Sequence, residues 1–241
     1  MKRLRFSVFA LQPLVLGVML CGPLCGAASE RQPHAANASE ETDSLKLFDG
    51  KTLDGWKIAE DFDFLNHGKI EVADGAIVLH AGRPGSAIYY GTKLPTMDYE
   101  ISLKARRVAG EDFFCGLTFM VGKEPLTLIV GGWNGEVVGL SCINGEPAVE
   151  NETCHYQKFE LGRWYSIRVR VTENQVTAWI DHDQVVDCDL ADKELSIWFE
   201  PETVTPLGIA TWRTTGAVKD IQVRRLKPDH AAHRAPAETN D

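Results

Sequence analysis

Apolar residues alternate with polar ones along most apolar stretches of this chain. From Tyr99 to Arg106, and again from Trp164 to Thr172, every second side chain is apolar and those between are mostly polar or charged. This period of two is typical of a β-strand with one face on a core and the other in water. No segment has a sustained helical spacing. Further β-like segments are 76–80, 87–90, 114–121, 126–131, 137–143, 176–180, 207–212 and 218–226.

Turn-forming pairs separate these segments. Asp-Gly or Asn-Gly stands at 49–50, 54–55, 74–75, 134–135 and 144–145. These pairs supply the left-handed or primed-turn conformations that hairpins need. About a dozen short strands with regular turns predict an all-β sandwich of two packed antiparallel sheets. A closed barrel is the alternative that the sequence leaves open.

The first residues have the three-part layout of a secretory signal peptide. Lys2, Arg3 and Arg5 precede an apolar run from Phe6 to Leu20, and small residues follow at 26–29. The run of about 15 residues is shorter than the roughly 20 that a membrane-spanning helix needs. We therefore expect cleavage near residues 27–30, a periplasmic or extracellular protein, and no stable membrane span.

Lipid anchoring is disfavoured. Leu20 and Leu24 precede Cys21 and Cys25, where a lipoprotein signal has a small residue.

The composition divides the rest of the chain into a linker, one β-domain and a tail. Residues 30–43 and 228–241 lack apolar periodicity and predict a disordered linker and a disordered tail around one β-domain at 44–227, after the signal at 1–29.

The net charge argues against nucleic acid and anionic membranes as partners. The formal charge of −9 becomes −12 once the three cationic signal residues are removed, because that segment holds no acidic residue. Nucleic acid and anionic membrane surfaces repel such a chain, whereas a neutral sugar polymer does not. We therefore expect no nucleic-acid partner.

Four cysteines remain after the signal, and export permits disulfides. A bridge between Cys142 and Cys154 is favoured, because a short polar loop separates them. Cys115, in an apolar segment, can equally be a small buried hydrophobic residue. No CxxC pair or close His/Cys cluster indicates zinc. No motif indicates a cofactor, and a divalent cation is left open.

A motif likeness narrows the function. The stretch Leu47-Phe48-Asp49-Gly50-Lys51-Thr52-Leu53-Asp54-Gly55-Trp56 resembles the opening motif of the 3-keto-disaccharide hydrolase domain, also described as a 3-keto-glycoside lyase and hydratase domain. Residues 72–78, 97–104, 163–165, 178–181 and 221–226 resemble its later elements, so the likeness spans nearly the whole β-domain. It implies a concanavalin A-like jelly-roll sandwich, in which the concave sheet commonly forms a glycan groove.

The resemblance also implies a reaction, the cleavage or hydration of 3-keto-glycosides. A ketone at C3 acidifies the C2 hydrogen, so that a base can remove it while the glycosidic oxygen leaves C1. Such chemistry needs a base, an electrophile or metal for the enolate, and an acid for the leaving group. Many members carry a histidine, flanked by an acidic residue and a glycine, just before the closing strand. The equivalent stretch of this chain, residues 206–215, contains no histidine. That departure leaves open a subgroup with altered activity or none.

Candidate site residues come from a few polar and aromatic stretches. Trp133, Asn134 and Trp212 are predicted to bind sugar, because aromatic rings stack on sugar C–H faces and amides bond hydroxyls. Their structural alternatives are a hairpin turn and a sheet margin. The candidate catalytic residues are Glu136, His155, Arg213 and Asp112. Each of these four has a structural alternative as a solvated turn or margin residue.

Two further functions stay open beside the enzyme. One is a non-catalytic, lectin-like module that binds an oligosaccharide or keto-sugar, and the other is a structural exported sandwich. The sequence has no Gly-x-Ser-x-Gly elbow, Walker loop or dinucleotide fingerprint. Acyl transfer, nucleotide hydrolysis and nicotinamide chemistry therefore have no support.

Overall fold

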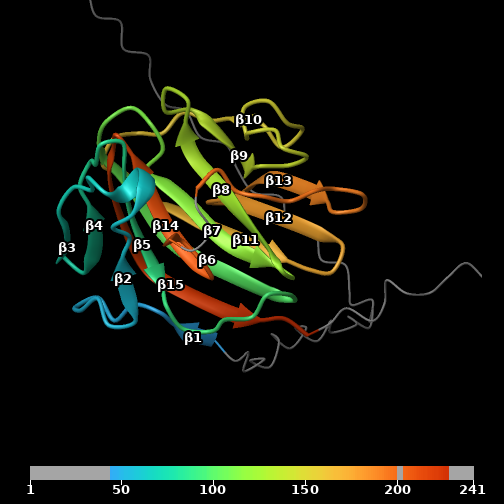
Figure 1. Cartoon of the computed structure of the whole chain (residues 1–241), viewed down its shortest axis with the longest axis horizontal. Helices are drawn as coiled ribbons and strands as arrows, with labels where there is room; N and C mark the ends of the chain where they lie inside the picture. Colours follow the sequence, from blue (N-terminus) through green and yellow to red (C-terminus); the bar gives the residue numbers. More distant parts are fainter. Residues whose placement is uncertain (1–43, 200–202, 228–241) are drawn as a thin grey trace, which may run out of the picture. The chain divides into compact units, whose positions relative to one another are not determined.

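Two antiparallel β-sheets contain most of residues 44–199 and 203–227, the part of the chain that this computed structural model describes (Figure 1). The predicted jelly-roll sandwich is confirmed, and the barrel alternative is wrong because the strands form two separate sheets. The predicted signal, linker and tail at 1–29, 30–43 and 228–241 lie outside the described residues. No helix in the described part is long and apolar enough to cross a membrane.

Sheet A has eight strands, in the spatial order β13-β12-β11-β6-β15-β4-β3, with β1 pairing with β15. Its bounds are β1 Ser44–Lys46, β3 Ile70–Ala73, β4 Ala76–Leu79, β6 Tyr99–Ala109, β11 Tyr165–Val171, β12 Gln175–Ile180, β13 Asp183–Asp189 and β15 Thr215–Arg225.

Sheet B has seven strands, in the order β10-β9-β8-β7-β14-β5-β2. Its bounds are β2 Trp56–Ile58, β5 Gly85–Tyr90, β7 Cys115–Val121, β8 Glu124–Gly132, β9 Val137–Ser141, β10 His155–Tyr156 and β14 Leu207–Trp212. A short 3-10 helix, η1, occupies Phe62–Phe64.

The core lies between the inner faces of the two sheets. On β6 and β11 the alternation seen in the sequence directs Ile101, Leu103, Ile167 and Val169 inward, where they are almost completely buried. Burial of this apolar surface is the main force that holds the sheets together.

The outer face of sheet B carries small side chains, and loops cover part of it. Built on Gly208, a Cβ atom would lie 2.4 Å from the carbonyl oxygen of Val204, and on Gly139 it would lie 3.0 Å from that of Thr153. The small residues therefore allow the loops to lie directly on the sheet. A second hydrophobic cluster fills this layer: Ala59, Phe64, Ala87, Phe113, Ile129, Val137, Ala148, Phe199, Val204 and Ala210.

The outer face of sheet A is polar and centres on Glu100 of β6. Its carboxylate accepts hydrogen bonds from Arg168 (3.2 Å), Arg170 (2.9 Å) and Arg224 (3.0 Å). Burial opposes ionisation of Glu100, but the hydrogen bonds from Arg170 and Arg224 outweigh it and lower the pKa of the carboxyl. The ionised form is thus favoured in the folded state.

A carboxyl whose pKa is lowered on folding stabilises the protein above its unfolded pKa, near 4.5 for Glu100, and this contribution is lost as the pH falls through the folded pKa. We expect Glu100→Gln to lower stability at pH 7 and to flatten the loss of stability below about pH 4.5. Urea denaturation from pH 7 to pH 3 measures both effects. The assignment would be contradicted if the stability of Glu100→Gln varied with pH in the same way as that of the wild type and of the exposed control Glu124→Gln.

Candidate functional site

A cleft of about 360 Å³ opens on the outer face of sheet B, between the loops that cover it. Strands β7, β8, β9 and β14 lie next to one another beneath it. The residues that line the cleft are Asp112, Phe113, Ile129, Trp133, Ser141, Pro147, Glu150, Trp198, Phe199 and Trp212.

Aromatic side chains dominate the cleft. Phe113 stacks on Trp212 with ring centroids 6.1 Å apart, and Phe199 lies 6.3 Å from Phe113 and 6.2 Å from Trp212. Trp133 and Trp198 remain 40% and 68% exposed. Large, partly exposed rings in a concavity provide the stacking surface that sugar C–H faces need.

The turn that carries Trp133 is held from below by Arg107. Trp133 has a φ of 44°, in the left-handed region. The Arg107 Nη2 donates to the carbonyls of Gly131 (3.2 Å) and Gly135 (2.8 Å), on either side of Trp133. Burial lowers the pKa of the Arg107 guanidinium, and the negative charge of Asp112 opposes that shift. A buried cation thus fixes the position of this tryptophan.

Asp112 lies between β6 and β7, and two hydrogen bonds that involve backbone N–H groups hold it in place. Its N–H donates to Thr214 Oγ1 (2.9 Å), and its Oδ1 accepts the N–H of Phe113 (2.7 Å). Within the described residues, its Oδ2 has no hydrogen-bond partner. One carboxylate oxygen is therefore free to accept a proton in the cleft.

Glu150 is the second carboxylate among the described residues that line the cleft. It stands in the loop between β9 and β10, which Asn151 organises. The Asn151 amide donates to the carbonyls of Leu140 (2.8 Å) and Glu146 (3.0 Å), and its Oδ1 accepts from the Thr153 hydroxyl (2.6 Å). Asn151 is 6% exposed, so this loop is tied firmly to β9.

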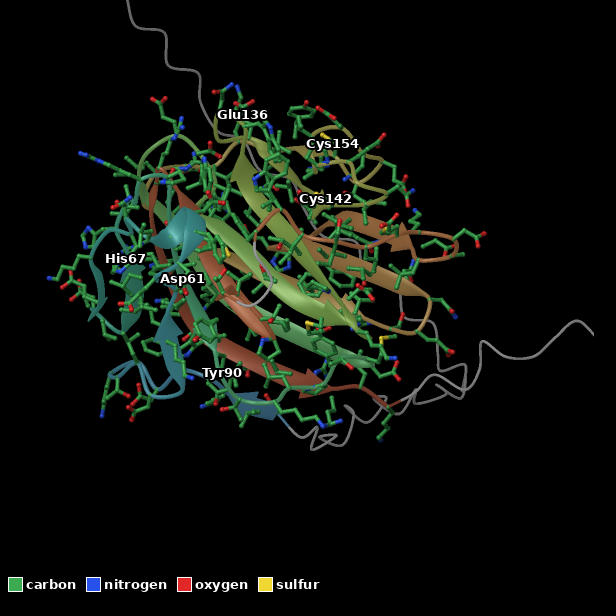
Figure 2. The ribbon with its side chains drawn as sticks, viewed as in Figure 1. Asp61, His67, Tyr90, Glu136, Cys142 and Cys154 are labelled. Carbon is green, nitrogen blue, oxygen red and sulfur yellow. The ribbon has the colours of Figure 1, made fainter. Side chains whose placement is uncertain are left out.

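Four of the predicted site residues do not line the cleft. Asn134 and Glu136 are exposed in the turn between β8 and β9, and Figure 2 shows Glu136 at the end of the sandwich. His155 is exposed on the edge strand β10, opposite Val138. Arg213 is exposed in the turn after β14. The structure therefore brings Asp112, Trp133 and Trp212 together and leaves Glu136, His155, Arg213 and Asn134 outside.

Seven of the ten residues that line the cleft were missing from the sequence-based set, and three of them, Glu150, Trp198 and Phe199, stand in the loops that cover sheet B. Trp198 lines the cleft, and its side chain is 68% exposed. Glu150 and Phe199 stand in loops without periodicity. An aromatic pair at 198–199 in a polar loop was the available signal.

The favoured disulfide is absent, since Cys142 and Cys154 are both free. Cys142 follows β9 and is buried, whereas Cys154 precedes β10 and is partly exposed. Figure 2 labels both cysteines.

Cys115 is completely buried, and its burial raises the pKa of the thiol to about 12. The alternative interpretation of this cysteine as a small buried hydrophobic residue agrees with that position. No group of three or more His, Cys, Asp or Glu side chains at 44–199 and 203–227 is placed to hold a metal ion.

No curated protein matches the chain. Among solved structures, the fold is similar to the carbohydrate-binding module CBM66 from Bacillus subtilis, with a TM-score of 0.51 and 12% identity over 70% of this chain and 95% of that one. It is also similar to the Crh5 transglycosylase in complex with NAG, with a TM-score of 0.52 and 11% identity over 76% of this chain and 83% of that one.

These structural likenesses show the fold alone, because the sequence identities are low. The family comparison covers residues 43–224, which match the model of the 3-keto-alpha-glucoside-1,2-lyase-like domain. The match takes in both sheets and every residue that lines the cleft. The chain therefore belongs to the family of 3-keto-alpha-glucoside-1,2-lyase-like domains.

Proposed function

We propose that this protein is exported and cleaves or hydrates 3-keto-glycosides in the cleft on sheet B. The observation that carries the proposal is the combination of a wall of aromatic rings with the carboxylates of Asp112 and Glu150 in one concavity. Rings hold the sugar by its C–H faces, and a carboxylate is a suitable base for an acidified C–H. Membership in the lyase-like family supports this chemistry.

In the proposed reaction, the free Oδ2 of Asp112 removes the C2 proton of a glycoside that is oxidised at C3. The C–H electron pair forms the C1=C2 bond, the bond from C1 to the glycosidic oxygen breaks, and the departing alkoxide takes up one proton. Glu150 is the candidate donor of that proton. Addition of water across the double bond in a second step gives the free 3-keto-sugar, so the sum is hydrolysis.

A glycan-binding module without turnover is the second candidate. Two observations favour it: aromatic rings outnumber carboxylates in the cleft, and Glu136, His155 and Arg213 lie outside it. A binding module needs only the stacking surface and polar groups at its margin.

Incubation of the purified protein with 3-keto-trehalose and with trehalose, with and without a divalent metal, tests the proposal. Release of reducing sugar from the keto-substrate alone is the expected result. Release from neither substrate, together with retention of the protein on immobilised glycan, would replace the enzyme by the binding module. Release from both at equal rates would contradict a role for the ketone.

The variant Trp133→Ala tests whether sugar binds in the cleft or elsewhere on the surface. We expect about tenfold weaker sugar binding, since one stacking face is lost, and little change in stability, because the ring is 40% exposed in a turn. Isothermal titration calorimetry and thermal denaturation measure the two effects. Trp164→Ala is the matched control, since Trp164 lies on sheet A between Arg106 and Lys219. An equal loss in both variants would contradict the assignment.

A further inference from the structure

A second groove lies on the outer face of sheet A, on the opposite side of the sandwich from the cleft. Its volume is about 580 Å³. Ser102 of β6, Ser166 of β11 and Gln222 of β15 are neighbouring polar residues in the groove. The hydroxyls of Ser102 and Ser166 have no hydrogen-bond partner within the described residues. The groove therefore offers uncharged donors and acceptors to a ligand.

The carboxylates that line this groove are already engaged. Asp181 pairs with Arg163 (2.9 Å) and accepts the N–H of Ser166. Asp220 pairs with Lys104 (3.0 Å), and Asp49 accepts two N–H groups of its own turn. A cation, Lys46, also lines the groove and has no ion-pair partner within the described residues. Among the described residues that line the groove, Lys46 is thus a cation free to meet an anionic ligand, whereas the carboxylate of Asp49 is held by backbone N–H groups.

Arg168 connects the groove to the cluster around Glu100. Three guanidiniums, from Arg168, Arg170 and Arg224, surround that one carboxylate, which leaves two positive charges in excess. Their side chains are 35–38% exposed, and Arg168 stacks 3.9 Å from the ring centroid of Trp179. Stacking and the shared carboxylate hold the guanidinium planes in place, and a fixed guanidinium matches a carboxylate ligand in two hydrogen bonds.

We propose that this face of sheet A is a binding site for an acidic glycan. Uronate carboxylates would bind the arginine cluster, and hydroxyls of the same chain would bind Ser102, Ser166 and Gln222. The ligand needs both carboxylates and hydroxyls to contact the whole surface, because the guanidiniums lie next to a groove that bears uncharged polar groups. A DNA duplex fits less well, because its sugar-phosphate backbone presents no free hydroxyls to Ser102, Ser166 and Gln222. The site is independent of the cleft on sheet B.

Titration calorimetry with polygalacturonate and with its fully methyl-esterified form tests the site, using the full chain. We expect binding of the acid form, weakened by added salt, and no binding of the ester. Arg168→Gln is expected to weaken binding about tenfold, the loss typical of a hydrogen bond to a charged group. Lys46→Gln, at an exposed position on β1, is expected to weaken it less. Lys123→Gln, in the turn between β7 and β8, removes the same charge outside the face and is expected to change nothing.

Circular dichroism establishes that each variant is folded. Trp133→Ala is expected to retain full binding of polygalacturonate, which separates this site from the cleft. Equal binding of acid and ester, an equal loss in Lys123→Gln and Arg168→Gln, or unchanged binding in both Arg168→Gln and Lys46→Gln would overturn the proposal. Equal affinity for a DNA duplex would overturn the assignment to a glycan.

Discussion

Asp112→Asn is expected to abolish most turnover of 3-keto-glycosides while leaving the fold intact. Asparagine keeps the Oδ1 acceptor for the N–H of Phe113 (2.7 Å), so the backbone is held as before. The variant cannot take up the C2 proton, and loss of a general base typically lowers kcat by about 10² to 10⁴. Steady-state release of reducing sugar from 3-keto-trehalose measures the effect.

One control and one further variant accompany this result. Glu111→Gln removes the neighbouring carboxylate, which does not line the cleft, and is expected to leave turnover unchanged. Glu150→Gln, which alters the candidate acid, is expected to slow substrates with a poor leaving group more than those with a good one. If Asp112→Asn turns over as fast as the wild type, Asp112 is not the base.

Asn151→Ala is expected to lower the free energy of unfolding by about 3 kcal/mol, because it removes several buried hydrogen bonds and leaves backbone carbonyls without a donor. The Asn151 amide bonds the carbonyl of Leu140 (2.8 Å) and that of Glu146 (3.0 Å). The loop that carries Glu150 also loosens, so sugar binding is expected to weaken with stability. Urea denaturation gives the free energy.

The variant Asn151→Asp tests the contribution of the amide donor by itself. The aspartate keeps an acceptor for Thr153 (2.6 Å) but loses the amide donor, so a stability loss close to that of Asn151→Ala is expected. Asn66→Ala, at an exposed asparagine, is the control and is expected to change stability by less than about 0.5 kcal/mol. A loss in Asn151→Ala no larger than in this control would show that the loop is held by other contacts.

The fold follows largely from the sequence, because long strands repeat their alternation often enough to be recognised. The β6 strand at Tyr99–Ala109 and the β11 strand at Tyr165–Val171 show this directly. In contrast, β2 and β10 at Trp56–Ile58 and His155–Tyr156 contain too few residues to display any period. They pair as strands only because neighbouring strands offer free edges.

The cleft follows from the sequence only in part. Trp133 and Trp212 were predicted, because aromatic residues beside glycine or polar groups stand out in a sequence. Trp198 and Glu150 were not, since their positions depend on how two loops fold onto the small residues of sheet B. Adjacency in sequence also misled: Glu136 and Arg213 follow Trp133 and Trp212 closely, yet the turns direct them away from the cleft.

The central claim is that the cleft on sheet B holds the sugar. A crystal structure of the Asp112→Asn variant soaked with a 3-keto-glycoside tests it most directly, because the substrate is expected to remain uncleaved. We predict electron density for the sugar between Trp133, Trp198 and Trp212, with its C2 hydrogen directed toward residue 112. Density confined to the groove on sheet A, or an empty cleft at a saturating concentration, would contradict the claim.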